Sequence, residues 1–240
     1  MQNRAGHIRN IFRFCCGKGR RNSILVVSSS RLSNCIAYAI RVLCGCIVRS
    51  FPEHHFNRPV VFYSNHTSNL DFPVIWAALP KKIRANLRPL AAEDYWSKGK
   101  LRRFLSLKIF QAILIARKAV NRENNPIQKM EQALSEGSSL IIFPEGTRSL
   151  SGEIGEFKPG IHHLASSDRQ LAFVPVYLEN LFRILPKGER FPLPLVAMLY
   201  IGDPIYLGPE ETKEDFLQRT RKALIDLNPN PTQRAHADSN

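Results

Sequence analysis

From Pro59 onward the chain alternates short apolar runs with longer segments in which apolar residues recur at helical spacing. The apolar runs are short enough to be buried strands, and they fall at residues 59–64, 110–115, 140–143, 172–178 and 195–201. The segments with helical spacing fall at residues 71–79, 94–107, 125–137, 159–167 and 213–227. Strands that alternate with helices predict an α/β fold, with a mixed, largely parallel sheet covered by helices.

A polar cluster follows directly on each of two predicted strands. Residues 65–71 read Asn-His-Thr-Ser-Asn-Leu-Asp after the first strand, and residues 144–149 read Pro-Glu-Gly-Thr-Arg-Ser after the strand at 140–143. In sheets of this kind, ligands bind at the carboxyl ends of the strands. We therefore expect the two clusters to form a site.

His66 and Asp71 stand five positions apart in the first cluster. On a continuous helix their side chains would diverge by about 140°. If His66 instead precedes the first turn, its ring can fold back toward Asp71, which would accept the proton of one ring nitrogen and leave the other as a base. The alternative is a plain strand-to-helix turn in which Asn65, Thr67 and Ser68 cap the helix.

The second cluster combines groups that suit a phosphate ester. Gly146 permits close backbone approach, Thr147 offers a hydroxyl, and Arg148 supplies a planar fork of donors. A charged turn closed by a Glu145–Arg148 pair is the alternative interpretation.

The two clusters, in this order, resemble motifs of the glycerophospholipid acyltransferases, specifically the 1-acylglycerol-3-phosphate acyltransferases. Asn65, His66 and Asp71 match the family's Asn-His-x-x-x-x-Asp block, and residues 143–149 match its Phe-Pro-Glu-Gly-Thr-Arg-Ser block throughout. The resemblance runs from residue 59 to residue 205.

Other family blocks agree more loosely. Residues 110–117 align with a strand that ends in a phosphate-binding Arg, but Gln111 stands where Gly is usual and Ala116 where Asp is common. Residues 157–160 and 174–176 fit later blocks. The resemblance implies 1-acyl-glycerol-3-phosphate (lysophosphatidate) as the acceptor and phosphatidic acid as the product. The two departures leave glycerol 3-phosphate, other lysophospholipids and lyso-aminolipids as alternative acceptors.

The resemblance implies a role for each matching residue. His66 would take the proton of the acceptor hydroxyl, Asp71 would orient His66, and the hydroxyl would attack an acyl thioester without a covalent enzyme intermediate. The glycerol phosphate would be held by Glu145, Gly146, Thr147, Arg148, Arg117 and Lys158. Acyl-CoA or acyl carrier protein would be the acyl donor, and neither a metal nor another cofactor is expected.

The formal net charge of +14 indicates an anionic partner. No acidic residue occurs before Glu53, and this stretch carries Arg4, Arg9, Arg13, Lys18, Arg20, Arg21, Arg31, Arg41 and Arg49. Such an arm favours adsorption to an anionic bilayer. We therefore expect a peripheral or monotopic protein on the cytoplasmic face of a membrane, without a full span, since no run of about 20 apolar residues occurs.

These observations divide the chain into a basic N-terminal arm (1–52), an acyltransferase domain (53–228) and a disordered tail (229–240). In the arm, residues 35–48 are expected to form an amphipathic helix, which would lie in the membrane interface or pack on the domain. A cleaved targeting peptide is a third interpretation of the arm. All five cysteines lie there with irregular spacing, so free thiols are expected, and the pair Cys15 and Cys16 could accept a palmitoyl chain.

The sequence leaves three alternative functions. A nucleic-acid-binding module would explain the charge, but the sequence has no zinc-finger spacing, RNA-binding strand signature or basic region joined to heptads. An acyltransferase homologue that has lost activity is the second. A peripheral membrane protein without catalysis is the third. Adsorption to a membrane requires neither polar cluster, so the presence of both argues against it.

Overall fold

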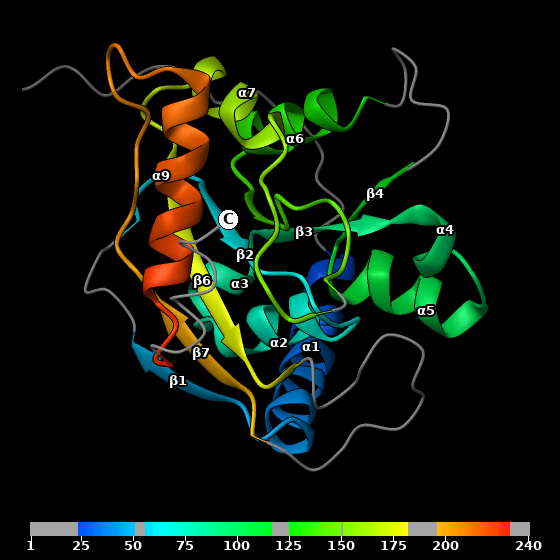
Figure 1. Cartoon of the computed structure of the whole chain (residues 1–240). Helices are drawn as coiled ribbons and strands as arrows, with labels where there is room; N and C mark the ends of the chain where they lie inside the picture. Colours follow the sequence, from blue (N-terminus) through cyan, green and yellow to red (C-terminus); the bar gives the residue numbers. More distant parts are fainter. Residues whose placement is uncertain (1–23, 51–55, 117–124, 150, 182–195, 231–240) are drawn as a thin grey trace, which may run out of the picture.

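The computed structural model describes residues 24–50, 56–116, 125–149, 151–181 and 196–230. Within them, one sheet has the order β1-β7-β6-β2-β5-β3-β4 (Figure 1). Its strands are β1 (Ile47–Ser50), β2 (Val60–Ser64), β3 (Leu87–Ala92), β4 (Ile113–Ile115), β5 (Ser139–Ile142), β6 (Ala172–Glu179) and β7 (Met198–Ile201). All neighbouring strands are parallel except β6 and β7. The predicted α/β class with a largely parallel sheet is confirmed.

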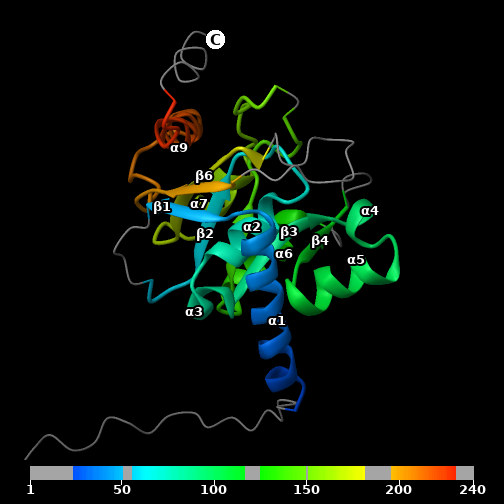
Figure 2. The same cartoon turned by 90° about the horizontal axis from the view of Figure 1, so that it is seen from below.

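The helices cover both faces of this sheet. They are α1 (Ile24–Leu43), α2 (Asp71–Ala78), α3 (Lys81–Arg84), α4 (Glu93–Trp96), α5 (Lys100–Phe104), the π-helical turn η1 (Leu105–Ile109), α6 (Pro126–Ser135), α7 (Gly160–Ser167) and α9 (Lys213–Asp226). Figure 2 shows α1 and α9 on opposite sides of the sheet. None of the helices described is long and apolar enough to cross a membrane.

Strand β2 explains why the central strands read as continuous apolar runs. Val60 and Phe62 pack in the core that includes α1 and α2, whereas Val61 and Tyr63 pack in the core that includes α6, α7 and α9. Successive side chains of a strand point to opposite faces of the sheet. A strand that is buried on both faces is therefore apolar at nearly every position.

The N-terminal part of the fold differs from the prediction. The helix expected at 35–48 ends at Leu43, and residues 47–50 form edge strand β1 beside β7. Gly45 has φ +52 there, and the Ile47 N–H donates to the Ala197 carbonyl. A left-handed glycine ends helices because only glycine adopts that conformation freely. The sheet therefore includes residues 47–50, which belong to the arm in the division expected from the sequence.

Of the two placements expected for the arm helix, the structure has α1 packed on the domain, against α2. Ala37 is buried, and Arg41 donates hydrogen bonds to the carbonyls of Ala77 and Ala78 at the end of α2. Cys15, Cys16 and residues 231–240 of the expected tail lie outside the described residues.

Two further differences concern the segment between α2 and β4. Strand β3 was not predicted, because Arg88 and Pro89 interrupt its apolar pattern; its first half pairs with β5 and its second with β4. The helix expected at 94–107 is broken at Gly99, which has φ +80 and separates α4 from the continuous α5 and η1. Strand β3 and helix α4 form one side of the site.

Candidate active site

The loop between β2 and α2 begins with a side chain that extends the sheet. The Asn65 amide donates to the Leu178 carbonyl at 3.0 Å, and its carbonyl oxygen accepts from the Leu178 N–H at 2.8 Å. It thus replaces backbone pairing between β2 and β6 where the chain leaves the sheet. Asn65 anchors the loop and is not the helix cap that the sequence suggested; α2 has no side-chain cap bond at Leu70.

His66 folds back over this loop toward Asp71, as predicted. The two atoms Nδ1 of His66 and Oδ2 of Asp71 are 2.7 Å apart. The same carboxylate oxygen accepts from the N–H groups of Thr67 at 2.7 Å and Ser68 at 2.8 Å, and Asp71 is fully buried. Three donors at the first residue of α2 fix the carboxylate, so with Nδ1 protonated, Nε2 of His66 is an acceptor.

The backbone and ring face of His66 are held from the second cluster. Its N–H donates to Oε1 of Glu145 at 2.8 Å, and its carbonyl accepts from the Ser149 N–H at 2.7 Å. The Phe143 ring stacks on the imidazole, with centroids 4.2 Å apart and planes at 19°. These contacts arise because β2 and β5 are parallel neighbours whose carboxyl ends meet at one edge.

The Glu145 carboxylate is held by two backbone contacts, one of them to His66. Its other carboxylate oxygen accepts from the Gly155 N–H at 3.1 Å, and the residue is only 7% exposed. Burial raises the pKa of the Glu145 carboxyl, while the N–H groups of Gly155 and His66 act in the opposite sense. Both carboxylate oxygens accept from backbone N–H groups, and one of these contacts holds the main chain of His66.

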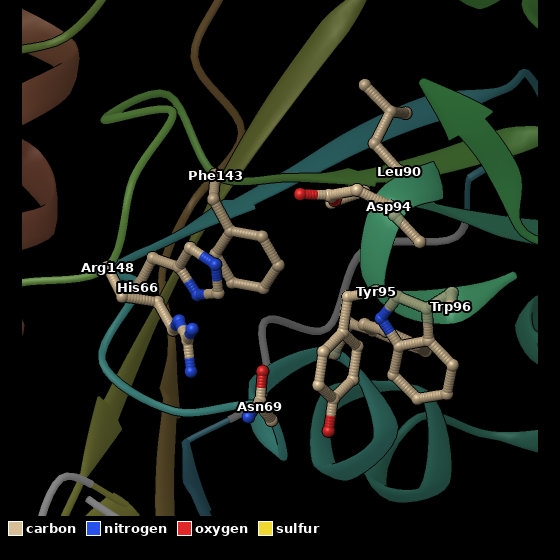
Figure 3. A pocket seen from close by; sticks show the side chains of 11 residues that line it. His66, Asn69, Leu90, Asp94, Tyr95, Trp96, Phe143 and Arg148 are labelled. Carbon is tan, nitrogen blue, oxygen red and sulfur yellow. The ribbon is translucent and has the colours of Figure 1, made fainter. Parts of the chain in front are cut away.

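A pocket of about 150 Å³ opens beside the imidazole. It is lined by His66, Asn69, Phe72, Leu90, Ala91, Ala92, Asp94, Tyr95, Trp96, Phe143 and Arg148. Figure 3 shows His66, Phe143 and Arg148 together on one side and Tyr95 and Trp96 on the other. The imidazole and the Arg148 guanidinium thus share a cavity whose far wall carries the rings of Tyr95 and Trp96 and the Asp94 carboxylate. A guanidinium in such a cavity suits an anionic group such as a phosphate.

The remaining predicted residues lie around the pocket or outside it. Gly146 has φ +70, and a Cβ there would lie 2.6 Å from the Lys158 ammonium nitrogen, so Lys158 packs over this glycine. Gly146 and Thr147 are exposed and are not among the residues lining the pocket. Arg117 lies outside the described residues. Gln111 has φ +51, a conformation that explains why glycine suits this position.

Sequence reasoning missed two parts of the site. Phe143 was placed at a strand end and in the second family block but was given no role, although an aromatic ring next to a polar cluster was a signal for stacking. The wall of residues 90–96 was missed because β3 was not predicted. The aromatic pair Tyr95 and Trp96 offered a weak signal there.

Comparison with known proteins covers the sheet and both clusters. The protein family described as Acyltransferase matches residues 47–179. A probable 1-acyl-sn-glycerol-3-phosphate acyltransferase of Mycoplasma genitalium is 33% identical over 132 residues, which are 55% of this chain and 47% of that protein. The human 1-acyl-sn-glycerol-3-phosphate acyltransferase alpha is 28% identical over 179 residues, 73% of this chain and 59% of that protein. The chain spans about half the length of the curated relatives it matches.

A solved structure has the same fold. The crystal structure of a 1-acyl-sn-glycerophosphate acyltransferase from Thermotoga maritima superposes with a TM-score of 0.69 at 19% identity, over 87% of this chain and 82% of that one. This likeness agrees with the α/β architecture described above.

Proposed function

This chain belongs to the acyltransferase family, and on that premise we propose that it transfers a fatty acyl group from an acyl thioester to the free hydroxyl of a lysophospholipid. The first acceptor to consider is 1-acyl-glycerol-3-phosphate, which would give phosphatidic acid. The observation that carries the proposal is the 2.7 Å contact of His66 with Asp71 at the edge of the pocket.

In the proposed mechanism His66 is a general base. Nε2 takes the proton of the acceptor hydroxyl as its oxygen attacks the thioester carbonyl carbon. The C–S bond then breaks, and the imidazolium returns the proton to the departing sulfur, so that a free thiol leaves. Asp71 acts through His66: its carboxylate holds the Nδ1 tautomer and stabilises the imidazolium.

Arg148 is proposed to bind the acceptor phosphate. Its guanidinium lines the same pocket as the His66 ring, and its planar donors fit phosphate oxygens. Lys158 lies over Gly146, beside the same loop, and would add positive charge. Holding the acceptor between Arg148 and His66 supports catalysis by fixing the hydroxyl near its base.

We propose further that the donor is acyl-CoA or acyl carrier protein, and that the chain acts at the cytoplasmic face of a membrane as a peripheral or monotopic protein. The net charge of +14 supports adsorption to an anionic surface, where the acceptor lipid lies.

An assay of thiol release by the purified full chain in lipid–detergent micelles tests the proposal. Acyl-CoA and acyl carrier protein are offered in turn, each with lysophosphatidate, another lysophospholipid, a lyso-aminolipid, glycerol 3-phosphate or no acceptor. Release that requires lysophosphatidate supports the proposed reaction. Release with another acceptor keeps the reaction class and changes the substrate, and no release with any pair contradicts the proposal.

A further inference from the structure

Helix α5 and the turn η1 expose three large apolar side chains. Leu101 is 70% exposed, Phe104 45% and Leu107 40%. They stand three positions apart, a spacing that keeps side chains near one face of a helix. We call residues 98–108 the α5–η1 surface. Single exposed apolar residues are ordinary, but a row of them marks a site of interaction.

The same residues carry a concentrated positive charge. The cations of the α5–η1 surface are Lys98, Lys100, Arg102, Arg103 and Lys108, and no Asp or Glu occurs between Asp94 and Glu123. Apolar side chains interleaved with Lys and Arg are the pattern of helices that lie on anionic bilayers.

Helix α5 and the turn η1 are firmly attached to the domain, although three of their apolar side chains are exposed. Ser106 and Ile109 are buried, and the Ser106 hydroxyl donates to the Arg103 carbonyl. The Phe110 N–H donates to the Leu105 carbonyl at 2.9 Å, which closes the π-helical turn. One face of α5 and η1 is therefore fixed in the core while another presents apolar groups to solvent.

The α5–η1 surface adjoins the pocket. Tyr95 and Trp96 of α4 line the pocket, and the Arg102 guanidinium carbon lies 4.5 Å from the centroid of the Tyr95 ring. Figures 1 and 2 both show α4 and α5 together at the β3–β4 end of the sheet. A bilayer against this surface would lie beside the Tyr95 and Trp96 wall of the pocket.

We infer that the α5–η1 surface docks on an anionic lipid bilayer, with Leu101, Phe104 and Leu107 inserted among the acyl chains and the five cations at the headgroups. Docking then presents the pocket to acceptor lipid in that leaflet, an inference that rests on the proposed function. An acidic protein would engage the cations but leave the row of apolar side chains unexplained, so a bilayer fits the whole pattern better.

The test compares binding of the full chain and its variants to vesicles of phosphatidylcholine with roughly 30% phosphatidylglycerol. L101S/F104S should weaken vesicle binding by at least about tenfold. K100A/R103A should weaken it by about 25-fold, since each cation near the surface is worth a factor of about five. The charge-matched control K213A/K222A on α9, on another side of the molecule, should change binding by less than about threefold.

Activity separates docking from chemistry. Transfer by L101S/F104S to acceptor presented in vesicles should fall in parallel with vesicle binding, whereas transfer to a short-chain lysophosphatidate dissolved as monomers should stay within about twofold of wild type. Unchanged vesicle binding in both double variants would overturn the inference. So would a loss confined to binding of acyl carrier protein, or to self-association, with vesicle binding intact.

Failure of the proposed function is recognised independently. If the wild-type chain transfers nothing to the monomeric acceptor, the proposed reaction fails, while the vesicle measurements alone still decide whether the α5–η1 surface docks on lipid.

Discussion

The imidazole of His66 is oriented by contacts of very different range along the chain. Asp71, five residues away, contacts Nδ1, and this local contact could be predicted from the sequence on the condition that His66 precedes the first turn of α2. Glu145 is 79 residues from His66, and its contact exists only because β2 and β5 are neighbours. The family resemblance implies that Glu145 binds substrate, whereas its contact with the His66 N–H favours a role in positioning His66.

A kinetic measurement distinguishes these two roles of Glu145. Glu145→Gln turns an NH2 group toward one of two N–H donors, so His66 shifts. We expect kcat to fall about 10- to 100-fold with KM within about twofold of wild type. Steady-state kinetics with lysophosphatidate measure both, beside the exposed control Glu153→Gln. A rise in KM at unchanged kcat would show that Glu145 binds substrate after all.

The raised pKa of Glu145 makes the folding free energy depend on pH. Because burial raises the pKa of Glu145 in the folded chain above its ordinary value of 4.5, the folded state binds more protons between the two values. Ionisation of Glu145 therefore costs folding free energy that is absent below pH 4.5, grows as pH rises from 4.5 to the folded pKa, and stays constant above it.

Urea unfolding of the wild-type chain and Glu145→Gln at a series of pH values isolates this contribution. The stability of wild type relative to the variant should fall as pH rises above 4.5 and then level off. A relative stability that rises with pH would mean that the hydrogen bonds outweigh burial.

At the scale of elements, apolar runs predicted the central strands, and helical spacing predicted the helices that contact them. These elements are buried, and burial requires apolar residues in a pattern that the sequence shows directly. β3 and β1 were not predicted. Arg88 and Pro89 interrupt the pattern of β3, and all of β1 is exposed at the edge. The break at Gly99 depends on a single backbone conformation, which periodicity does not report.

Replacing Gly45, between α1 and β1, is expected to lower the folding stability. An added Cβ would lie 3.3 Å from the Val196 Cα, and the residue has φ +52. Gly45→Ala should therefore cost about 2 kcal/mol of folding free energy. The control Gly137→Ala, also left-handed but with open space around it, should cost only about 1 kcal/mol. Equal losses in urea unfolding would argue that Val196 does not constrain this turn.

At the scale of the whole molecule, the strand order could not be predicted, because it depends on pairings between segments far apart in sequence. The expectation that both polar clusters meet at one edge nevertheless held, since β2 and β5 are adjacent and parallel. The net charge of +14 indicates an anionic partner, but it does not identify the face of the molecule on which that partner binds.

The charge predicts how bilayer association depends on salt. Raising salt from about 0.1 M to 1 M shortens the screening length from about 10 Å to 3 Å. Binding of the full chain to anionic vesicles should weaken by at least about tenfold and yet persist, because apolar insertion is not screened. Vesicle sedimentation across this range measures the effect; binding that does not respond to salt would contradict a role for the cations.

The most direct test of the central claim, that His66 is the base for acyl transfer to a lysophospholipid, compares acceptor-dependent thiol release by wild type, His66→Ala and the control His163→Ala, an exposed histidine on α7. The account predicts a loss of about 10²- to 10⁴-fold for His66→Ala and none for the control. Undiminished release by His66→Ala would contradict it.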